Sequence, residues 1–233
     1  MDNYIGVDIS INSTAIFIDS NRGCTILSFT NKKDSNKYIK ELESYGVKFF
    51  FIENAFSKDY SVNESLKLKC YDNIAHTISS EVLKAIDPNV NSYCQIEGYS
   101  FSRNTKSIID VVSLSTLIRC YLMETIKNMQ MFIISPKSLK LGACKMCYEP
   151  INIGIKKPKY KFVNKDGVAG GSFKKPDMYK AILEGNINTP IFTMLNDYKD
   201  DLLNRDKIPN PIEDINDATF ACRLLQKIMT CKL

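Results

Sequence analysis

The stretch Tyr4-Ile5-Gly6-Val7-Asp8-Ile9-Ser10 decides the fold that we predict for this chain. Its apolar residues lead into one aspartate, and the polar residues after it predict a tight turn. The run Thr14-Ala15-Ile16-Phe17-Ile18-Asp19 then predicts a second strand. A buried strand seldom holds a carboxylate, because desolvating the charge is costly unless a partner or a metal compensates. We therefore expect Asp8 at a strand end, facing a cation or polar groups; an ordinary aspartate that caps the turn is the alternative.

Strand and helix patterns alternate along the rest of the chain. Further strands are predicted at Cys24–Phe29, Val47–Ile52, Tyr93–Glu97 and Met129–Ile134. Helices are predicted at Asp34–Tyr45, Val62–Ile86, Ile108–Ile126, Lys175–Leu183, Ile191–Leu203 and Ile215–Met229, with another starting at Ser135-Pro136. The order predicts an α/β fold with a mixed sheet, in which a three-stranded antiparallel start precedes parallel strands and helices cover both faces.

Length and composition favour one domain over residues 1–233. No apolar run approaches the length that spans a bilayer, and the first residues lack the basic and apolar regions of a signal peptide. We expect no membrane association. Most of the eight cysteines lie in apolar periodic segments, which predicts small buried hydrophobes in an intracellular, reducing compartment such as the cytoplasm.

Two other candidate chemistries receive little support from the sequence. Cys144-Lys-Met-Cys147 has ligand spacing, but a tetrahedral zinc site needs two more ligands and no second such pair exists; two chains could share one site. His76, the one histidine, falls off the apolar row of its helix, so we expect it near the surface. A histidine-based catalytic triad is therefore not expected.

The charge is unevenly distributed. Between Pro136 and Lys175 there are ten lysines and only two acidic residues, with tyrosines and phenylalanines interleaved. Residues 142–170 show weak periodicity, and we interpret them as a lysine-rich insertion or arm within the domain. A solvated surface loop is the plain interpretation. The alternative is a phosphate-binding surface with aromatic rings available for stacking on bases.

Acidic residues recur at three distant points of the chain. Asp8 and Glu97 end apolar strands, and Asp214 and Asp217 lie three residues apart at the start of the last predicted helix, so they share one helix face. Helix capping and the helix dipole could account for the last two. They do not account for the carboxylates that end strands. Four converging carboxylates would repel one another unless divalent cations neutralise them, and oxygen ligands suit Mg²⁺ or Mn²⁺.

These motifs together resemble the RuvC-type Holliday junction resolvases of the RNase H-like, or retroviral-integrase-like, superfamily, and a viral or phage branch more than the bacterial enzyme. The resemblance covers most of the chain as short islands. The islands are Gly6–Ser10, Ile96–Gly98, Asp214-x-x-Asp217-Ala218, Phe101-x-x-Asn104, Pro136–Lys140 and Gly171-x-x-x-Lys175. Departures are the insertion, the long segment Asn54–Asp87 and a spacing from Glu97 to Phe101 that is one residue longer than expected.

The resemblance implies a Mg²⁺-dependent (or Mn²⁺-dependent) endonuclease on branched DNA. Two ions would be held by Asp8, Glu97, Asp214 and Asp217, with Lys175 near the scissile phosphate as a further catalytic residue. Phe101 would stack or wedge at the junction. The remaining residues expected to bind DNA are Arg103, Asn104, Lys106, Lys137, Lys140 and Lys174. The resemblance further implies a homodimer, with the helix Ile108–Ile126 as the candidate interface. The protein would then act in the cytoplasm or in a virus-infected host cell.

Two other functions stay open at this point. Gly6-Val7-Asp8-Ile9-Ser10-x-x-Ser13-Thr14 also looks like the phosphate-binding start of the actin and sugar-kinase ATPases. That fold needs a second glycine-rich phosphate loop, for which no Asp-Gly-Gly pattern is present, and the chain is short for two lobes. A non-catalytic nucleic-acid-binding scaffold is the third possibility, and the intact set of carboxylates argues against it.

Overall fold

A six-stranded mixed sheet organises the computed structural model of the chain, which describes residues 1–31, 37–53, 57–98, 105–154, 157, 159–185, 187–205 and 208–231. The strand order is β4-β3-β2-β1-β5-β6. β1, β2 and β3 pair antiparallel, whereas β4, β5 and β6 each pair parallel to a neighbour. The strands are β1 (Asn3–Asp8), β2 (Ser13–Ser20), β3 (Gly23–Thr30), β4 (Lys48–Phe51), β5 (Ser92–Glu97) and β6 (Met129–Ile134). This order confirms the predicted mixed sheet, in which three antiparallel strands at the start precede parallel strands.

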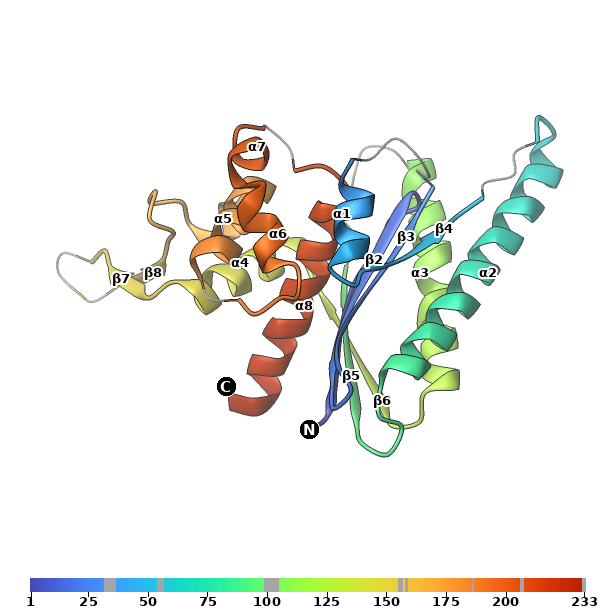
Figure 1. The fold of residues 1–233 in the computed structure, drawn as a ribbon, viewed down its shortest axis with the longest axis horizontal. Coiled ribbons are helices and arrows are strands. Elements are labelled where there is room, and N and C mark those ends of the chain that lie inside the picture. The colour runs from blue at the N-terminus through green and yellow to red at the C-terminus, as the bar shows by residue number, and fades with distance from the viewer. Residues whose placement is uncertain are drawn as a thin grey trace.

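Helices cover both faces of the sheet (Figure 1). One face packs against α2 (Tyr60–Ala85) and α3 (Thr105–Thr125). The other packs against the remaining helices, with α8 lying directly on β1 and β2. These helices are α1 (Tyr38–Ser44), α4 (Pro136–Cys147), α5 (Lys175–Glu184), α6 (Phe192–Asp197), α7 (Lys199–Leu203) and α8 (Ile212–Cys231), together with the 3₁₀ turn η1 (Gly170–Ser172).

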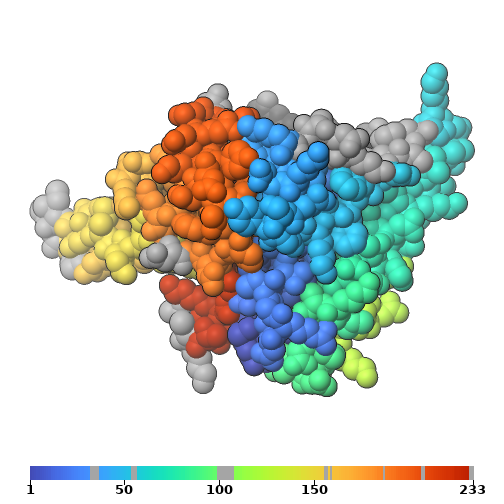
Figure 2. All heavy atoms as spheres, viewed as in Figure 1, coloured from blue at the N-terminus to red at the C-terminus, as the bar shows by residue number. Residues whose placement is uncertain are grey.

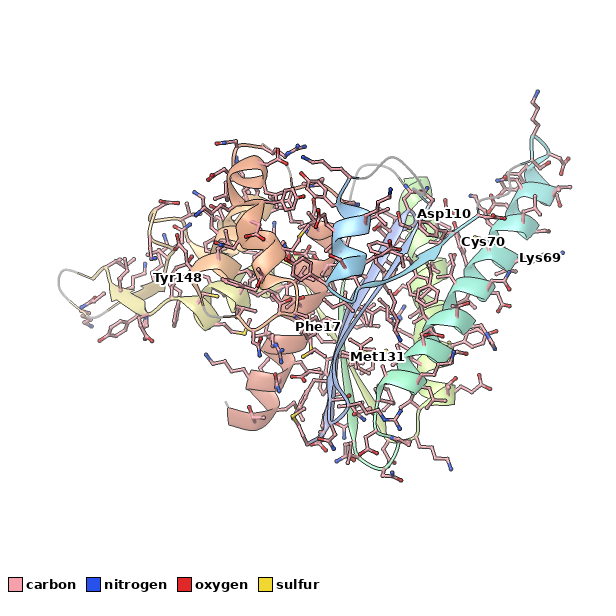
Figure 3. All side chains as sticks on the ribbon, viewed as in Figure 1. Phe17, Lys69, Cys70, Asp110, Met131 and Tyr148 are labelled. Atoms are coloured by element: carbon pink, nitrogen blue, oxygen red, sulfur yellow. The ribbon has the colours of Figure 1, made fainter. Side chains whose placement is uncertain are left out.

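Strand periodicity explains why there are two hydrophobic cores. Successive side chains of a strand point to opposite faces, so Phe17 enters the core under α8 while Ile16 and Ile18 enter the core under α2 and α3. In Figure 3, Phe17 lies on the α8 side of the sheet and Met131 on the side of α2 and α3. All residues of β2 are buried, as expected for a central strand covered on both faces.

Gly6 permits the close approach of α8 to β1. A Cβ atom at Gly6 would lie 2.0 Å from the carbonyl oxygen of Ala218 and 2.4 Å from the backbone nitrogen of Cys222. Both neighbours are backbone atoms, which cannot rotate away. The glycine in the opening stretch therefore fixes the position of α8, and with it the position of the acidic residues in its first turns.

The lysine-rich segment is more ordered at its start than the sequence predicted. Residues 142–147, which we placed in the arm, form the end of α4, and Ala143 and Cys144 are buried in the core. Beyond them, β7 (Pro150–Asn152) and β8 (Tyr160–Phe162) pair as an antiparallel hairpin. This β7–β8 hairpin projects from the α4 side of the molecule (Figures 1 and 2). The division into one domain with an arm stays a prediction.

One further difference concerns the predicted helices. The helix predicted over Ile191–Leu203 is two short helices, α6 and α7, which meet at Tyr198. The Tyr198 hydroxyl donates a hydrogen bond to Glu41 Oε1 at 3.2 Å, and its ring meets Tyr38 edge-on. These contacts with α1 hold the chain at the break.

Within the described residues, no helix combines the length and apolar character needed to cross a membrane.

Candidate metal-dependent active site

Two carboxylates lie side by side at the end of neighbouring parallel strands. Asp8 is the last residue of β1 and Glu97 is the last residue of β5. The parallel register pairs Val7 with Ile96, so the next residue of each strand is an acidic one. The carboxyl ends of parallel strands meet at one edge of a sheet, where binding sites of α/β proteins usually form. The predicted position of both residues at strand ends is confirmed.

The first turns of α8 add the other two acidic residues of the predicted set. Asp217 is 2% exposed and Asp214 is 5% exposed. Carboxylate oxygens of Asp8, Glu97 and Asp217 all lie within 4.8 Å of one another, which makes these three residues a potential metal-binding group. Asp214 lies next to this group, because it interacts with Asp8 both through its charge and through a side-chain hydrogen bond. We call the four residues the carboxylate cluster.

Burial and mutual repulsion raise the pKa values in the cluster. Desolvation is the largest cause for Asp8, followed by the charges of Asp214 and Glu97, and together they hold its pKa well above 3.8. Desolvation also raises the pKa of Asp214, to about 6, and that of Glu97. The positive charge of Lys175 opposes the shift at all three residues. The site therefore disfavours several negative charges held this close together.

Lys175, at the start of α5, is paired with the cluster. Its ammonium group forms an ion pair with Asp217 and lies 3.4 Å from Glu213 Oε1. Glu213 was not predicted from the sequence, because it precedes Asp214 and adjacent helical residues point in different directions. Its contact with Lys175, and its charge, which raises the pKa values of Glu97 and Asp214, place Glu213 beside the cluster. A capping interpretation of the acidic pair would not have included it either.

The donor set fits a divalent cation. All candidate ligands are carboxylate oxygens, the type that Mg²⁺ and Mn²⁺ prefer. Two buried carboxylate oxygens, Asp214 Oδ2 and Glu213 Oε2, have no hydrogen-bond partner among the described residues. Buried polar atoms without a partner are uncommon in folded proteins, and a bound ion is one way in which such atoms are satisfied. Asp214 is more than nine-tenths buried, so an unpartnered oxygen there is costly.

The raised pKa values predict how pH and metal together affect stability. Because the pKa values of Asp8 and Asp214 are higher in the folded state than the usual 3.8, the native protein binds more protons than the unfolded chain. Their contribution to stability is then lost as the pH rises from about 4 through about 6. In EDTA we expect the melting temperature to fall across this range. Saturating Mg²⁺ should reduce the fall, because the ion replaces the proton as the compensating charge.

Differential scanning calorimetry at a series of pH values, with Mg²⁺ and with EDTA, measures this effect. The difference between the two curves isolates the cluster, since groups elsewhere titrate equally in both. We expect the difference to grow between about pH 4 and about pH 7, and to be small in the variant Asp8→Asn. Parallel curves in Mg²⁺ and EDTA would contradict a metal site at these carboxylates.

The predicted DNA-binding lysines that the structure describes lie on α4 and just before α5. The charge of Lys140, on α4, lowers the pKa of Glu97, which places this lysine close to the site. Lys137 is exposed on the same helix. Lys174 is exposed at the residue before α5. Phe101, Arg103 and Asn104 lie outside the residues that the structure describes, and the same holds for the side chain of Lys106.

The two cysteines with ligand spacing pack within the protein. Cys144 is buried beside Gly170, and a Cβ atom at Gly170 would lie 2.3 Å from Cys144 Cβ. Cys147 packs against Gly185. Burial raises the pKa of the Cys147 thiol to about 12. Both side chains therefore act as small apolar groups here. His76 is exposed, as predicted, and its ring meets Tyr121 edge-on.

Comparisons with known proteins give similarity in shape alone. No family model matches the chain, and no curated protein matches its sequence. Among solved structures, the chain is similar to Thermus thermophilus RuvC in complex with a Holliday junction substrate, at 10% identity and a TM-score of 0.48 over 99% of this chain and 96% of that one. It is also similar to the yeast mitochondrial Holliday junction resolvase Ydc2, at 9% identity and a TM-score of 0.47 over 97% and 78% of the two chains.

Proposed function

We propose that the protein is a metal-dependent, structure-selective endonuclease that cleaves branched DNA, and that it acts as a Holliday junction resolvase. One observation carries the proposal: oxygens of Asp8, Glu97 and Asp217, from three distant parts of the chain, lie within 4.8 Å of one another at the carboxyl edge of the sheet. The buried and unpartnered Oδ2 of Asp214 adds to this support. The motifs that hold these residues are the ones that resemble the RuvC-type resolvases.

Each residue of the site has a role in this proposal. The carboxylate cluster would hold two Mg²⁺ or Mn²⁺ ions, which when bound would activate a water molecule and stabilise the leaving oxygen of a phosphodiester. Lys175 presents a positive charge beside the cluster, where it would stabilise charge that develops on the scissile phosphate. Lys137, Lys140 and Lys174 would hold the flanking phosphates. Burial of Asp217 and Asp214 fixes their orientation before substrate binds.

The two alternative functions have less support. The described residues form a single six-stranded sheet with a small hairpin, and not two lobes that each contain a sheet. An ATPase of the actin type is therefore disfavoured. A non-catalytic scaffold would not require buried carboxylates to converge, because each of them loses solvation free energy in the fold.

We further propose that the protein works as a homodimer, since two strands of a four-way junction must be cut. One face of α3 is buried in the core, through Leu114, Ile118 and Leu122. The opposite face still exposes Ile109 at 61% and Met123 at 60% of their surfaces. These exposed residues make α3 the candidate interface, and sedimentation equilibrium of the protein would measure the association.

Incubation with labelled DNA tests the proposed activity. Four-way, flap and linear substrates of equal length should be compared in Mg²⁺ and in EDTA. We expect paired incisions in the four-way junction, few in linear DNA and none in EDTA. Cleavage of the linear duplex at the same rate as the four-way junction would show that the protein does not select branched DNA. An absence of cleavage in Mg²⁺ and Mn²⁺, with normal junction binding, would favour the scaffold.

The β7–β8 hairpin should supply part of the DNA affinity. Lys157, Lys159 and Lys161 are exposed on this projecting element, and the ring of Tyr160 is 66% exposed. Each lysine that leaves a phosphate contact lowers the slope of log affinity against log salt by about one. Changing all three lysines to Gln should therefore weaken junction binding and lower the slope by about two to three.

A charge-matched control separates this contribution from net charge. Lys48, Lys69 and Lys127 are also exposed, and they lie on β4, on α2 and after α3. Changing them to Gln should leave the slope unaltered, and fluorescence anisotropy over a range of salt concentrations measures both variants. Deleting the whole predicted arm is not a suitable test, because Ala143 and Cys144 belong to the core. Equal slopes for the two triple variants would show that DNA is held elsewhere.

A further inference from the structure

Lys175 has two acidic partners, of which only one belongs to the potential metal-binding group. Its ammonium group pairs with Asp217, which belongs to the group of three carboxylates that could bind a metal, and with Glu213, which is not one of those three. The lysine side chain is 29% exposed, whereas the side chains of Asp217 and Glu213 are 2% and 13% exposed. The lysine therefore reaches into the cluster from its more open side.

The charge of Lys175 takes a place that a metal ion would also need. It is the largest favourable charge at Asp8 and at Glu97, where it lowers both pKa values against the effect of burial. Asp217 Oδ2 accepts a hydrogen bond from Lys175, so the lone pair used in that bond is not available to a metal ion. A metal ion bound to this carboxylate would also repel the ammonium group at short range.

Glu213 offers the position to which the lysine can move. Its Oε1 lies 3.4 Å from Lys175 Nζ, and its Oε2 is buried without a hydrogen-bond partner among the described residues. A carboxylate with one unused oxygen can accept a stronger, shorter hydrogen bond from an ammonium group. Only a small rotation of the lysine side chain is required, because both carboxylates already contact it.

We propose that Lys175 is an exchangeable internal counter-ion of the carboxylate cluster, and that Glu213 is a positioning residue that retains Lys175 when a divalent ion takes Asp217. This inference rests on the proposed metal-dependent function and deepens it. It assigns Glu213 a role outside metal coordination. It also explains how the lysine stays beside the substrate phosphate after the metal has displaced it from Asp217.

Metal binding without DNA tests the first half of the proposal. A counter-ion that occupies Asp217 in most molecules lowers the apparent metal affinity by the fraction of molecules that are free to bind. Isothermal titration with Mn²⁺ at about pH 8 should therefore give a roughly tenfold tighter site in Lys175→Met than in the wild-type protein. Lys180→Met is the matched control, because Lys180 lies on the same helix and pairs with the remote Asp166. It should not alter the affinity.

Cleavage kinetics at saturating Mn²⁺ test the second half. Glu213→Gln should lower kcat by about tenfold, because the lysine is no longer held by a charged partner, while the Mn²⁺ affinity changes by less than about threefold. The same substitution should have no further effect in the Lys175→Met background. A merely structural role for Glu213 predicts the same loss in both backgrounds, and a metal-ligand role predicts a large loss of Mn²⁺ affinity.

The outcomes separate this inference from the proposed function. Unaltered or weaker Mn²⁺ binding in Lys175→Met, while the wild-type protein still cuts junctions, overturns the counter-ion role alone. Equal losses from Glu213→Gln in both backgrounds overturn the positioning role. A wild-type protein that neither binds Mn²⁺ at the cluster nor cleaves junctions would overturn the proposed function, and the inference with it. Thermal unfolding of every variant in EDTA verifies that it is folded.

Discussion

Replacing Asp8 with Asn is expected to lower the rate of junction cleavage by about 10³-fold or more, while junction affinity changes by less than about threefold. Asp8 is one of the three residues whose oxygens could bind one cation. DNA affinity, in contrast, comes mainly from contacts between lysines and phosphates. Single-turnover cleavage and anisotropy with the same labelled four-way junction measure the two quantities separately.

The same variant should also be more stable than the wild-type protein in EDTA. The asparagine removes a buried charge that Asp214 and Glu97 repel, and that repulsion is part of why the pKa of Asp8 is raised. Asp197→Asn, at the exposed end of α6, is a control for the substitution itself and should alter neither cleavage nor stability. Near-normal turnover in Asp8→Asn would show that Asp8 is not part of the active site. Reduced stability in EDTA would mean that the charge is compensated in the metal-free protein.

Replacing Gly6 with Ala should cause a large loss of stability. The new Cβ would lie 2.0 Å from Ala218 O, so β1 and α8 would have to separate. Overpacking a core by such an amount costs about 3 kcal/mol or more, which corresponds to a melting temperature lower by roughly 10 °C in a chain of this size. Cleavage should fall as well, because α8 supplies Asp217 to the cluster.

Gly171→Ala provides the matched control, because its Cβ would make only an ordinary contact, 3.5 Å from the flexible side chain of Lys137. Its melting temperature should stay within about 2 °C of the wild-type value. Thermal unfolding followed by circular dichroism compares the two variants. If the two variants have equal melting temperatures, the sheet and α8 are not packed as closely as described.

The elements and most of the cluster could be predicted because their signals are local. A strand that ends in a carboxylate is visible in the residues themselves, and so is the three-residue spacing of Asp214 and Asp217. Parallel pairing then brings Asp8 and Glu97 together without further information. The half-buried positions of Asp8 and Glu97 follow from the apolar strands that precede them.

The features that the sequence did not reveal depend on tertiary contacts. Glu213 contacts Lys175, which comes from another helix, and its charge acts on Glu97 from a distant strand. Cys144 packs against the distant Gly170, so the first residues of the lysine-rich segment belong to α4 and to the core. The break between α6 and α7 depends on Tyr198, whose partner Glu41 lies far away in the chain. In each case the deciding partner is remote in sequence, and no local periodicity could have indicated it.

In the proposed function, divalent ions bound by the carboxylate cluster would perform the cleavage. Anomalous scattering from a crystal soaked in Mn²⁺ tests it most directly. We predict two peaks about 4 Å apart, with oxygens of Asp8, Glu97 and Asp217 as ligands and with Lys175 turned toward Glu213. A map without manganese at these carboxylates, from crystals whose protein still cleaves junctions in Mn²⁺, would contradict this account.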